Sequence, residues 1–163
     1  MTIENRVALF PELNYITDPK IYEFAVNCLA KIPEYFFHIP ASSSGKYHPN
    51  YALGDGGLVR HVRAAMNIYH AMELSDAHMW YQWDCSLGLT GTAFNDAAYL
   101  ALLFHDAFKS GKSDTNSEVP PNEHTVHEHP LLASSFLKEQ LRLCENASHD
   151  FSMIVLEAAD AIA

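Results

Sequence analysis

The sequence is poor in cysteine, poor in basic residues and free of long apolar runs. Its three cysteines, Cys28, Cys85 and Cys144, lie far apart and form no C-x-x-C pair. A dispersed, odd-numbered set predicts reduced and mostly buried thiols in a cytoplasmic protein rather than a disulfide framework. No apolar run approaches the roughly 20 residues that a membrane-spanning helix needs. The polar residues 4–6 do not resemble the start of a signal peptide.

Basic residues are half as frequent as acidic ones, ten against twenty, which gives a formal net charge of −10. This charge opposes binding to a long nucleic-acid backbone, which attracts basic surfaces. A small anionic substrate remains compatible, because a bound metal can supply local positive charge. The other proportions, 48% apolar and 18% charged, are those of a globular protein, and residues 1–163 suffice for one domain with one core.

Alternation of apolar and polar residues, which is typical of strands, is nowhere convincing, so the sequence predicts an all-α fold. The clearest helix covers residues 18–32, where Asp18 is a suitable N-cap and Pro19 suits the first helical position. Further helices are expected at residues 57–73, about 95–111, 130–143 and 151–163. Loops or irregular connections are expected at residues 39–57, 75–94 and 110–123.

The helix expected over residues 57–73 carries a histidine on its apolar side. Leu58, His61, Ala65, Ile68 and Met72 recur at helical spacing and would share one face, directed toward the core. A lone core histidine is more often satisfied by a backbone carbonyl than by a metal. This position alone therefore leaves both interpretations open.

The adjacent pair His105-Asp106 ends the most apolar segment of the chain, residues 98–104. An ionised aspartate buried without a partner is strongly destabilising, so the pair needs a compensating interaction. That interaction is either a divalent metal, which imidazole and carboxylate both bind, or a simple hydrogen bond at the end of a helix. His61 favours the metal, because two facing helices would bring it to this pair.

Histidine is abundant, with ten copies, and three of them stand in the short segment EHTVHEHP. His129 starts a helix whose Leu132 and Phe136 point inward with it, which favours a role as a metal ligand. His124 and His127 fit an ordinary loop equally well. No shared role is expected for His38, His70, His78 and His149.

Four short motifs, in order, resemble the HD superfamily of metal-dependent phosphohydrolases. GGLVRH at residues 56–61 resembles the family's GGL-x-x-H helix start, and LLFHDAFK at residues 102–109 resembles its H-D-x-x-K segment. EHPLLASSFL at residues 128–137 resembles the start of the next helix. GKYHP at residues 45–49 resembles the lead-in of bacterial and phage members and of the HD module of a Bacillus-type 3′–5′ exoribonuclease. The likeness spans about residues 42–140 and is specific for the superfamily, not for a substrate.

The resemblance implies an all-α HD-type helical bundle around a centre of one or two divalent ions (Mn, Fe, Ni, Zn, Co or Mg). The implied metal ligands are His61, His105, Asp106 and His129. It further implies that metal-activated water hydrolyses a phosphoester of a nucleotide, a cyclic nucleotide or a short oligonucleotide, and the acidic charge favours the smaller substrates. Asp106 and Lys109 are the expected catalytic residues, and the residues expected to contact substrate phosphate are Lys46, His48 and Lys109.

The sequence departs from the family pattern at two places. Phe108 stands where the family usually has glycine, and its ring is expected to narrow the space above the metal. Family members close the site with an aspartate from a late helix, and Asp160 is the candidate here. The chain stops at Ala163 within an apolar helix that has no C-cap glycine. Either the C-terminal helices of the family are missing, or this is a minimal variant in which Asp160 completes the site.

Two other functional interpretations remain open. One is a metal-binding HD-fold module with a regulatory or interaction role and no turnover, and the other is a purely structural helical domain. A bound metal would distinguish the enzyme and the regulatory module from the structural domain. Turnover of a nucleotide would distinguish the enzyme from the regulatory module.

Overall fold

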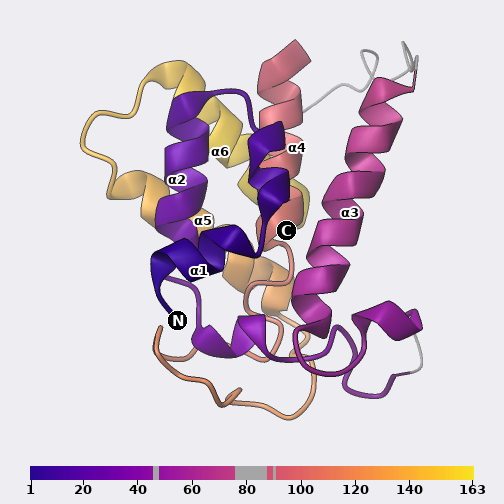
Figure 1. Ribbon diagram of the computed structural model, residues 1–163. Coiled ribbons are helices and arrows are strands. Elements are labelled where there is room, and N and C mark those ends of the chain that lie inside the picture. The colour runs from indigo at the N-terminus through magenta and orange to yellow at the C-terminus, as the bar shows by residue number, and fades with distance from the viewer. Residues whose placement is uncertain (46–47, 76–87, 90) are drawn as a thin grey trace.

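The computed structural model describes residues 1–45, 48–75, 88–89 and 91–163, and these residues form helices and connecting turns without any strand. This confirms the all-α prediction. The α-helices in Figure 1 are α1 (Ile3–Ala8), α2 (Pro19–Leu29), α3 (Gly57–Leu74), α4 (Gly91–Phe104), α5 (His129–Arg142) and α6 (His149–Ile162). Short 3₁₀ turns lie at Pro11–Tyr15, Glu34–Phe37 and Asn50–Ala52.

Helix α2 follows the sequence closely. The Asp18 carboxylate accepts hydrogen bonds from the backbone N–H groups of Lys20 at 2.7 Å and Ile21 at 3.3 Å, and Pro19 occupies the first turn. The helix ends at Leu29, three residues before the predicted end. Its buried residues are Ile21, Phe24, Ala25, Cys28 and Leu29, which recur at helical spacing.

Helix α4 is the central element, because it packs against α2, α3 and α6 (Figure 1). Its predicted boundaries were wrong at both ends. It begins at Gly91, and Asn95 is no cap, since its side chain hydrogen-bonds Tyr69 and Glu73 of α3 instead. It ends at Phe104, and the chain continues through a series of turns to residue 110. His105 and Asp106 therefore lie just beyond the helix, where side chains can turn toward a neighbouring element.

Helices α5 and α6 begin one and two residues earlier than predicted, at His129 and His149. The Ser148 hydroxyl caps α6 by accepting a hydrogen bond from the N–H of Phe151. The two helices pack against each other, and α6 packs on α4.

The buried face of α3 differs from the predicted one. Ile68 and Met72 are exposed, at 60% and 37%, whereas Val62 and Met66 are fully buried. The buried stripe is thus centred on Leu58, Val62 and Met66, at intervals of four residues. His61 lies at the edge of this stripe with a quarter of its side chain exposed, 25%. It is therefore held by the core on one side and accessible on the other.

Helix α1 was not predicted, and it is attached by a buried arginine. Arg6 donates to the carbonyls of Leu29 and Ile32 at 2.8 and 2.9 Å and to the Glu34 carboxylate at 2.5 Å. This long-range network fixes a six-residue helix that is too short to be stable alone. Most of the irregular connection predicted for residues 75–94, including Cys85 and His78, lies outside the described residues.

Candidate metal centre

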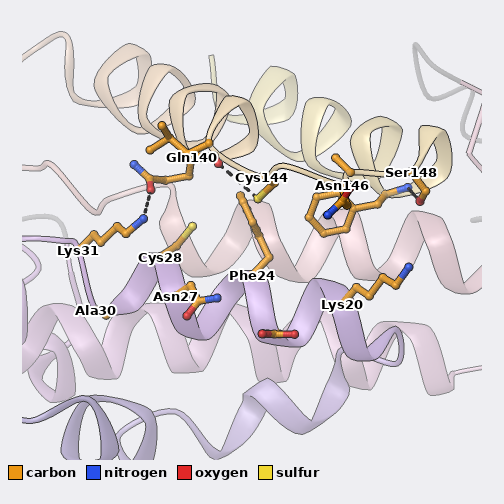
Figure 2. Close-up of a pocket in the computed structure, with 14 residues that line it drawn as sticks. Lys20, Phe24, Asn27, Cys28, Ala30, Lys31, Gln140, Cys144, Asn146 and Ser148 are labelled. Atoms are coloured by element: carbon orange, nitrogen blue, oxygen red, sulfur yellow. Dashed lines mark hydrogen bonds between the residues drawn. The ribbon is translucent and has the colours of Figure 1, made fainter.

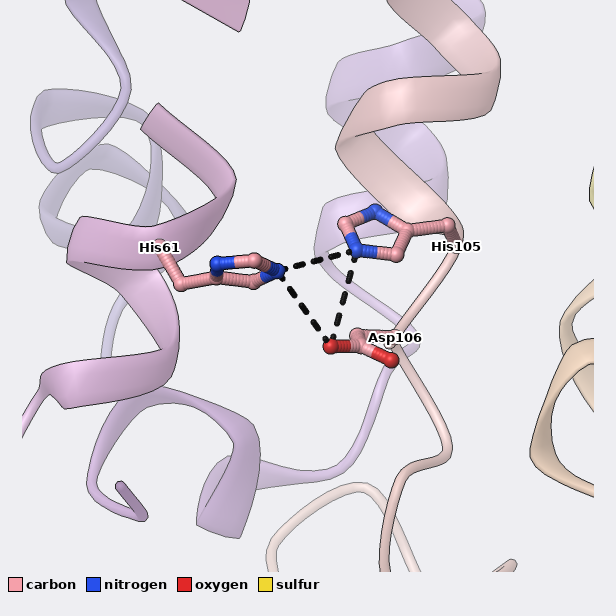
Figure 3. Close-up of side chains that lie close together, drawn as sticks. All are labelled: His61, His105 and Asp106. Carbon is pink, nitrogen blue, oxygen red and sulfur yellow. Dashed lines mark hydrogen bonds and ion pairs between the residues drawn. The ribbon is translucent and has the colours of Figure 1, made fainter. Parts of the chain in front are cut away.

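Three side chains from two separate elements converge at the end of α4. His61 reaches across from α3, and His105 and Asp106 follow α4, as Figure 3 shows. His61 Nε2 lies 3.4 Å from His105 Nε2 and 3.8 Å from Asp106 Oδ2, and His105 Nε2 lies 3.5 Å from the same oxygen. The sequence prediction that the two elements bring these three residues together is thus met by the geometry.

Two glycines fix where α3 begins and hence where His61 lies. Gly56 has a φ of +66°, a left-handed conformation that other residues rarely adopt. A Cβ atom on Gly57 would lie 2.3 Å from the carbonyl oxygen of Ala52, so only glycine allows this close approach of the loop. Arg60 then holds the loop by donating to the carbonyls of Tyr51, Leu53 and Asp55.

Backbone carbonyls set the orientation of the other two histidines. His105 Nδ1 lies 2.8 Å from the carbonyl oxygen of Leu102, and His129 Nδ1 lies 2.7 Å from that of Val126. A carbonyl only accepts, so each Nδ1 carries a hydrogen, and in the neutral ring Nε2 then presents a lone pair. For His105 this lone pair faces Asp106 Oδ2. His129 instead donates through Nε2 to Asp106 Oδ1, so both nitrogens of its ring carry a hydrogen. These carbonyls have no signature in the sequence, and no sequence argument could have identified them.

His129 approaches the opposite side of the carboxylate from the other two histidines. Its Nε2 lies 3.0 Å from Asp106 Oδ1, whereas His61 and His105 face Oδ2. It stands at the start of α5, which the cluster therefore ties to the end of α4. The hydrogen bond to Asp106 raises the pKa of His129 above its usual value.

Asp106 is the buried centre of the cluster, with only 3% of its surface exposed. Burial raises the pKa of its carboxyl, but the hydrogen bond from His129 and the charge of Lys109 outweigh burial, and the net pKa lies below the usual range. Lys109 Nζ donates to Oδ2 at 2.7 Å. The carboxylate is consequently ionised and surrounded by nitrogen atoms on both oxygens.

His61 is held in its neutral form. Burial lowers its pKa to about 4, and the neighbouring His105 adds to this effect. A neutral imidazole is the form that binds a metal. His61 therefore offers a ligand without first having to release a proton at neutral pH.

The residues present fit a divalent metal. Two ligands about 2.1 Å from one tetrahedral ion lie about 3.4 Å apart, close to the 3.4–3.8 Å between the three ligand atoms. A lone pair that faces a carboxylate is repelled unless a proton or a cation lies between them. A divalent ion held by these residues would relieve this repulsion for His105 and would compensate the buried charge of Asp106.

The predicted substrate residues have different surroundings. Lys109 lies at the cluster and is paired with Asp106. His48 packs edge-on against the His61 ring, with 4.9 Å between ring centroids, and its Nδ1 is buried without a hydrogen-bond partner. A buried nitrogen without a hydrogen-bond partner beside the cluster favours a role for His48 in binding a ligand. Lys46 lies outside the described residues.

The structure does not bring Asp160 to the cluster. Its side chain is 49% exposed on α6 and pairs with Lys138 at 2.7 Å, because α6 turns its apolar side toward α4 and α5. His124 and His127 are exposed in the loop before α5. Phe108, which was expected to narrow the space above the metal, instead points into the core and packs against Phe136 with 5.2 Å between ring centroids.

A separate cavity of about 680 Å³ lies between α2 and the connection from α5 to α6 (Figure 2). Phe24 and Phe151 line it, and both free cysteines of the described residues, Cys28 and Cys144, lie in its wall. Burial raises the pKa of the Cys28 thiol, so it is unreactive. None of the predicted site residues that the structure describes lines this cavity.

Comparison with known proteins yields no relative: no family model, no curated protein and no solved structure matches this chain. Within the residues that the structure describes, no helix is both long enough and apolar enough to cross a membrane.

Proposed function

We propose that this chain is a metal-dependent phosphohydrolase of the HD type. The observation that carries the proposal is the convergence of His61, His105 and Asp106 at ligand spacing, with His129 on the other carboxylate oxygen. The resemblance of the four sequence motifs to the HD superfamily supports it, because the histidines and the aspartate that meet in space are those that the motifs contain.

In this proposal His61, His105 and Asp106 hold a divalent ion, and His129 either completes its ligand set or fixes the carboxylate. When bound, such an ion lowers the pKa of a water ligand to about 7 and neutralises phosphate charge. Lys109 and His48 lie beside the ligands, and together with Lys46 they are the groups proposed to contact phosphate oxygens. A lysine ammonium suits this role as a point charge.

The proposed substrate is a small phosphorylated molecule, with a nucleotide as the first choice. The net charge of −10 disfavours a long nucleic acid. Six of the nine described basic side chains already hydrogen-bond or pair within the protein: Arg6, Lys31, Arg60, Arg63, Lys109 and Lys138. Few cations are therefore available for an extended phosphate backbone.

The test has two measurements. Elemental analysis of protein purified without chelator should find about one divalent ion or more per chain, and the Asp106→Asn variant should have lost it. A panel of nucleotides, cyclic nucleotides and dinucleotides, assayed with Mn²⁺, Ni²⁺, Mg²⁺ and Co²⁺, should then show phosphate release or phosphodiester cleavage by the wild type only.

A folded wild-type protein that takes up no metal on dialysis would overturn the proposal. Metal binding without turnover of any substrate would instead assign the chain to the metal-binding regulatory modules.

A further inference from the structure

Two kinds of group compete for a single oxygen atom in the metal centre. Asp106 Oδ2 accepts a hydrogen bond from Lys109 Nζ at 2.7 Å, and the same oxygen faces His105 Nε2 at 3.5 Å and His61 Nε2 at 3.8 Å. An ion held by the two imidazoles and Oδ2 must lie close to this oxygen. The lysine ammonium already occupies part of the space around it.

Lys109 cannot avoid the competition by moving its backbone. Its N–H donates to the carbonyl of Asp106 at 3.0 Å, and its own carbonyl accepts from Val126 at 2.9 Å. The side chain is only 11% exposed. Two cations held a few ångströms apart in a partly buried site repel each other strongly. The aliphatic side chain of lysine is flexible, however, and can carry its charge to a new position.

We infer that Lys109 is a built-in placeholder cation: it neutralises buried Asp106 while no metal is bound, and it leaves Oδ2 when the metal enters. The cluster is then only slightly destabilising when no ion is bound, because Lys109 compensates the charge of Asp106. After displacement, the ammonium becomes available at the rim of the site. There it can meet a phosphate oxygen, a consequence that rests on the proposed function, whereas the placeholder role itself rests on metal binding alone.

The buried Arg6–Glu34 pair indicates why the residue at position 109 is a lysine. Arg6 is fixed by three backbone carbonyls in addition to the Glu34 carboxylate, so it is a permanent partner. Asp106 is the one hydrogen-bond partner of Lys109 Nζ within the residues that the structure describes. A single hydrogen bond can be exchanged for a metal, whereas the four hydrogen bonds of Arg6 hold it in place.

Removal of the Lys109 ammonium is therefore expected to tighten metal binding. Chelator-treated wild type, Lys109→Met and Lys109→Gln should be titrated with Mn²⁺ in a calorimeter, with Lys112→Met as the control for a loss of charge at an exposed site three residues away. We expect Lys109→Met and Lys109→Gln to bind Mn²⁺ about 10-fold more tightly than wild type, or better. Lys112→Met should bind like wild type.

Thermal unfolding supplies a second readout that keeps the test valid if one variant is unstable. Without metal, Lys109→Met should melt below wild type because Asp106 Oδ2 has lost its hydrogen-bond donor, and Lys109→Gln, which can still donate to Oδ2, should melt between the two. Saturating Mn²⁺ should raise the melting temperature of both variants more than that of wild type. Unchanged or weaker Mn²⁺ affinity in both folded variants would overturn the placeholder role.

Inorganic phosphate tests the second half of the inference. Mn²⁺-loaded wild type should bind phosphate more tightly than Mn²⁺-loaded Lys109→Gln, and equal affinity would overturn the role of the displaced ammonium. If the protein binds Mn²⁺ as expected but hydrolyses no substrate, the proposed function is refuted and the placeholder role of Lys109 remains. A wild type that binds no Mn²⁺ would remove both.

Discussion

Two buried aspartates stand ten residues apart around helix α4, and they have opposite surroundings. Asp96, near its start, is 1% exposed and accepts hydrogen bonds from the N–H groups of Thr17 and Asp18 at 2.7 and 2.9 Å, and from the Thr17 hydroxyl. Asp106, just after its end, is 3% exposed and faces three imidazoles and an ammonium.

The difference separates a structural carboxylate from one that is suited to bind an ion. Asp96 is satisfied by neutral donors that belong to the fold, so nothing further has to bind there. Asp106 is satisfied only by groups that carry a charge or can present a lone pair to a metal. Burial and residue type are the same at the two sites, and the partners decide the role.

The strongest test of this comparison replaces each carboxylate by an amide. Asp106→Asn should reduce Mn²⁺ or Zn²⁺ affinity by about 100-fold or more, because a charged ligand is lost and an amide oxygen is a weaker donor to a divalent ion. Asp96→Asn should leave metal affinity within about 3-fold of wild type. Calorimetric titration measures both, and a similar loss in the two variants would show that the fold rather than the ligand set controls the affinity.

The next test compares two histidines of α3. His61→Ala should lower metal affinity by at least about 10-fold, because one of the imidazole ligands is lost. His70→Ala should leave it unchanged, since His70 stacks on Tyr15 with 3.9 Å between ring centroids and hydrogen-bonds the Tyr99 hydroxyl at 2.8 Å, away from the cluster. His70→Ala should instead cost about 1–2 kcal/mol of stability. Loss of metal in His70→Ala would contradict the assignment of these two residues.

The sequence predicted five of the described α-helices and the grouping of His61, His105 and Asp106, because both depend on local patterns that physical chemistry constrains tightly. Asp18 and Pro19 mark the start of α2, and an aspartate after an apolar helix demands a partner. The predicted buried face of α3 was wrong at Ile68, because helical periodicity alone does not decide which of two adjacent rows of side chains is buried. Tertiary contacts decide this, and they are not visible in one segment.

Long-range and backbone interactions were beyond the reach of the sequence. Arg6 attaches α1 to residues 23 to 28 positions later in the chain, and no local pattern predicts such a partner. The Leu102 and Val126 carbonyls that orient His105 and His129 belong to residue types with no special signal. The sequence predicted which side chains lie together, and only the structure shows how they are held.

A further test measures how much the structural aspartate, Asp96, contributes to stability. Asp96→Ala should destabilise the protein by about 2–4 kcal/mol, because the N–H groups of Thr17 and Asp18 lose their acceptor in a buried place. Denaturant unfolding of the metal-free protein measures this loss. Metal affinity of the folded fraction should stay close to that of wild type. A cost below about 0.5 kcal/mol would mean that solvent replaces the carboxylate and that Asp96 is not needed for the junction.

The smallest effect is expected at a third aspartate, Asp160. It is about half exposed, at 49%, and its partner Lys138 is 35% exposed, so the ion pair is screened by water. Exposed pairs of this kind contribute about 0–1 kcal/mol. Asp160→Asn should therefore change stability by less than about 1 kcal/mol and leave metal content unchanged, as elemental analysis beside Asp106→Asn would measure. If Asp160→Asn loses metal, α6 must bring its carboxylate to the centre in another arrangement, and the contrast between buried and exposed aspartates would no longer identify the ligands.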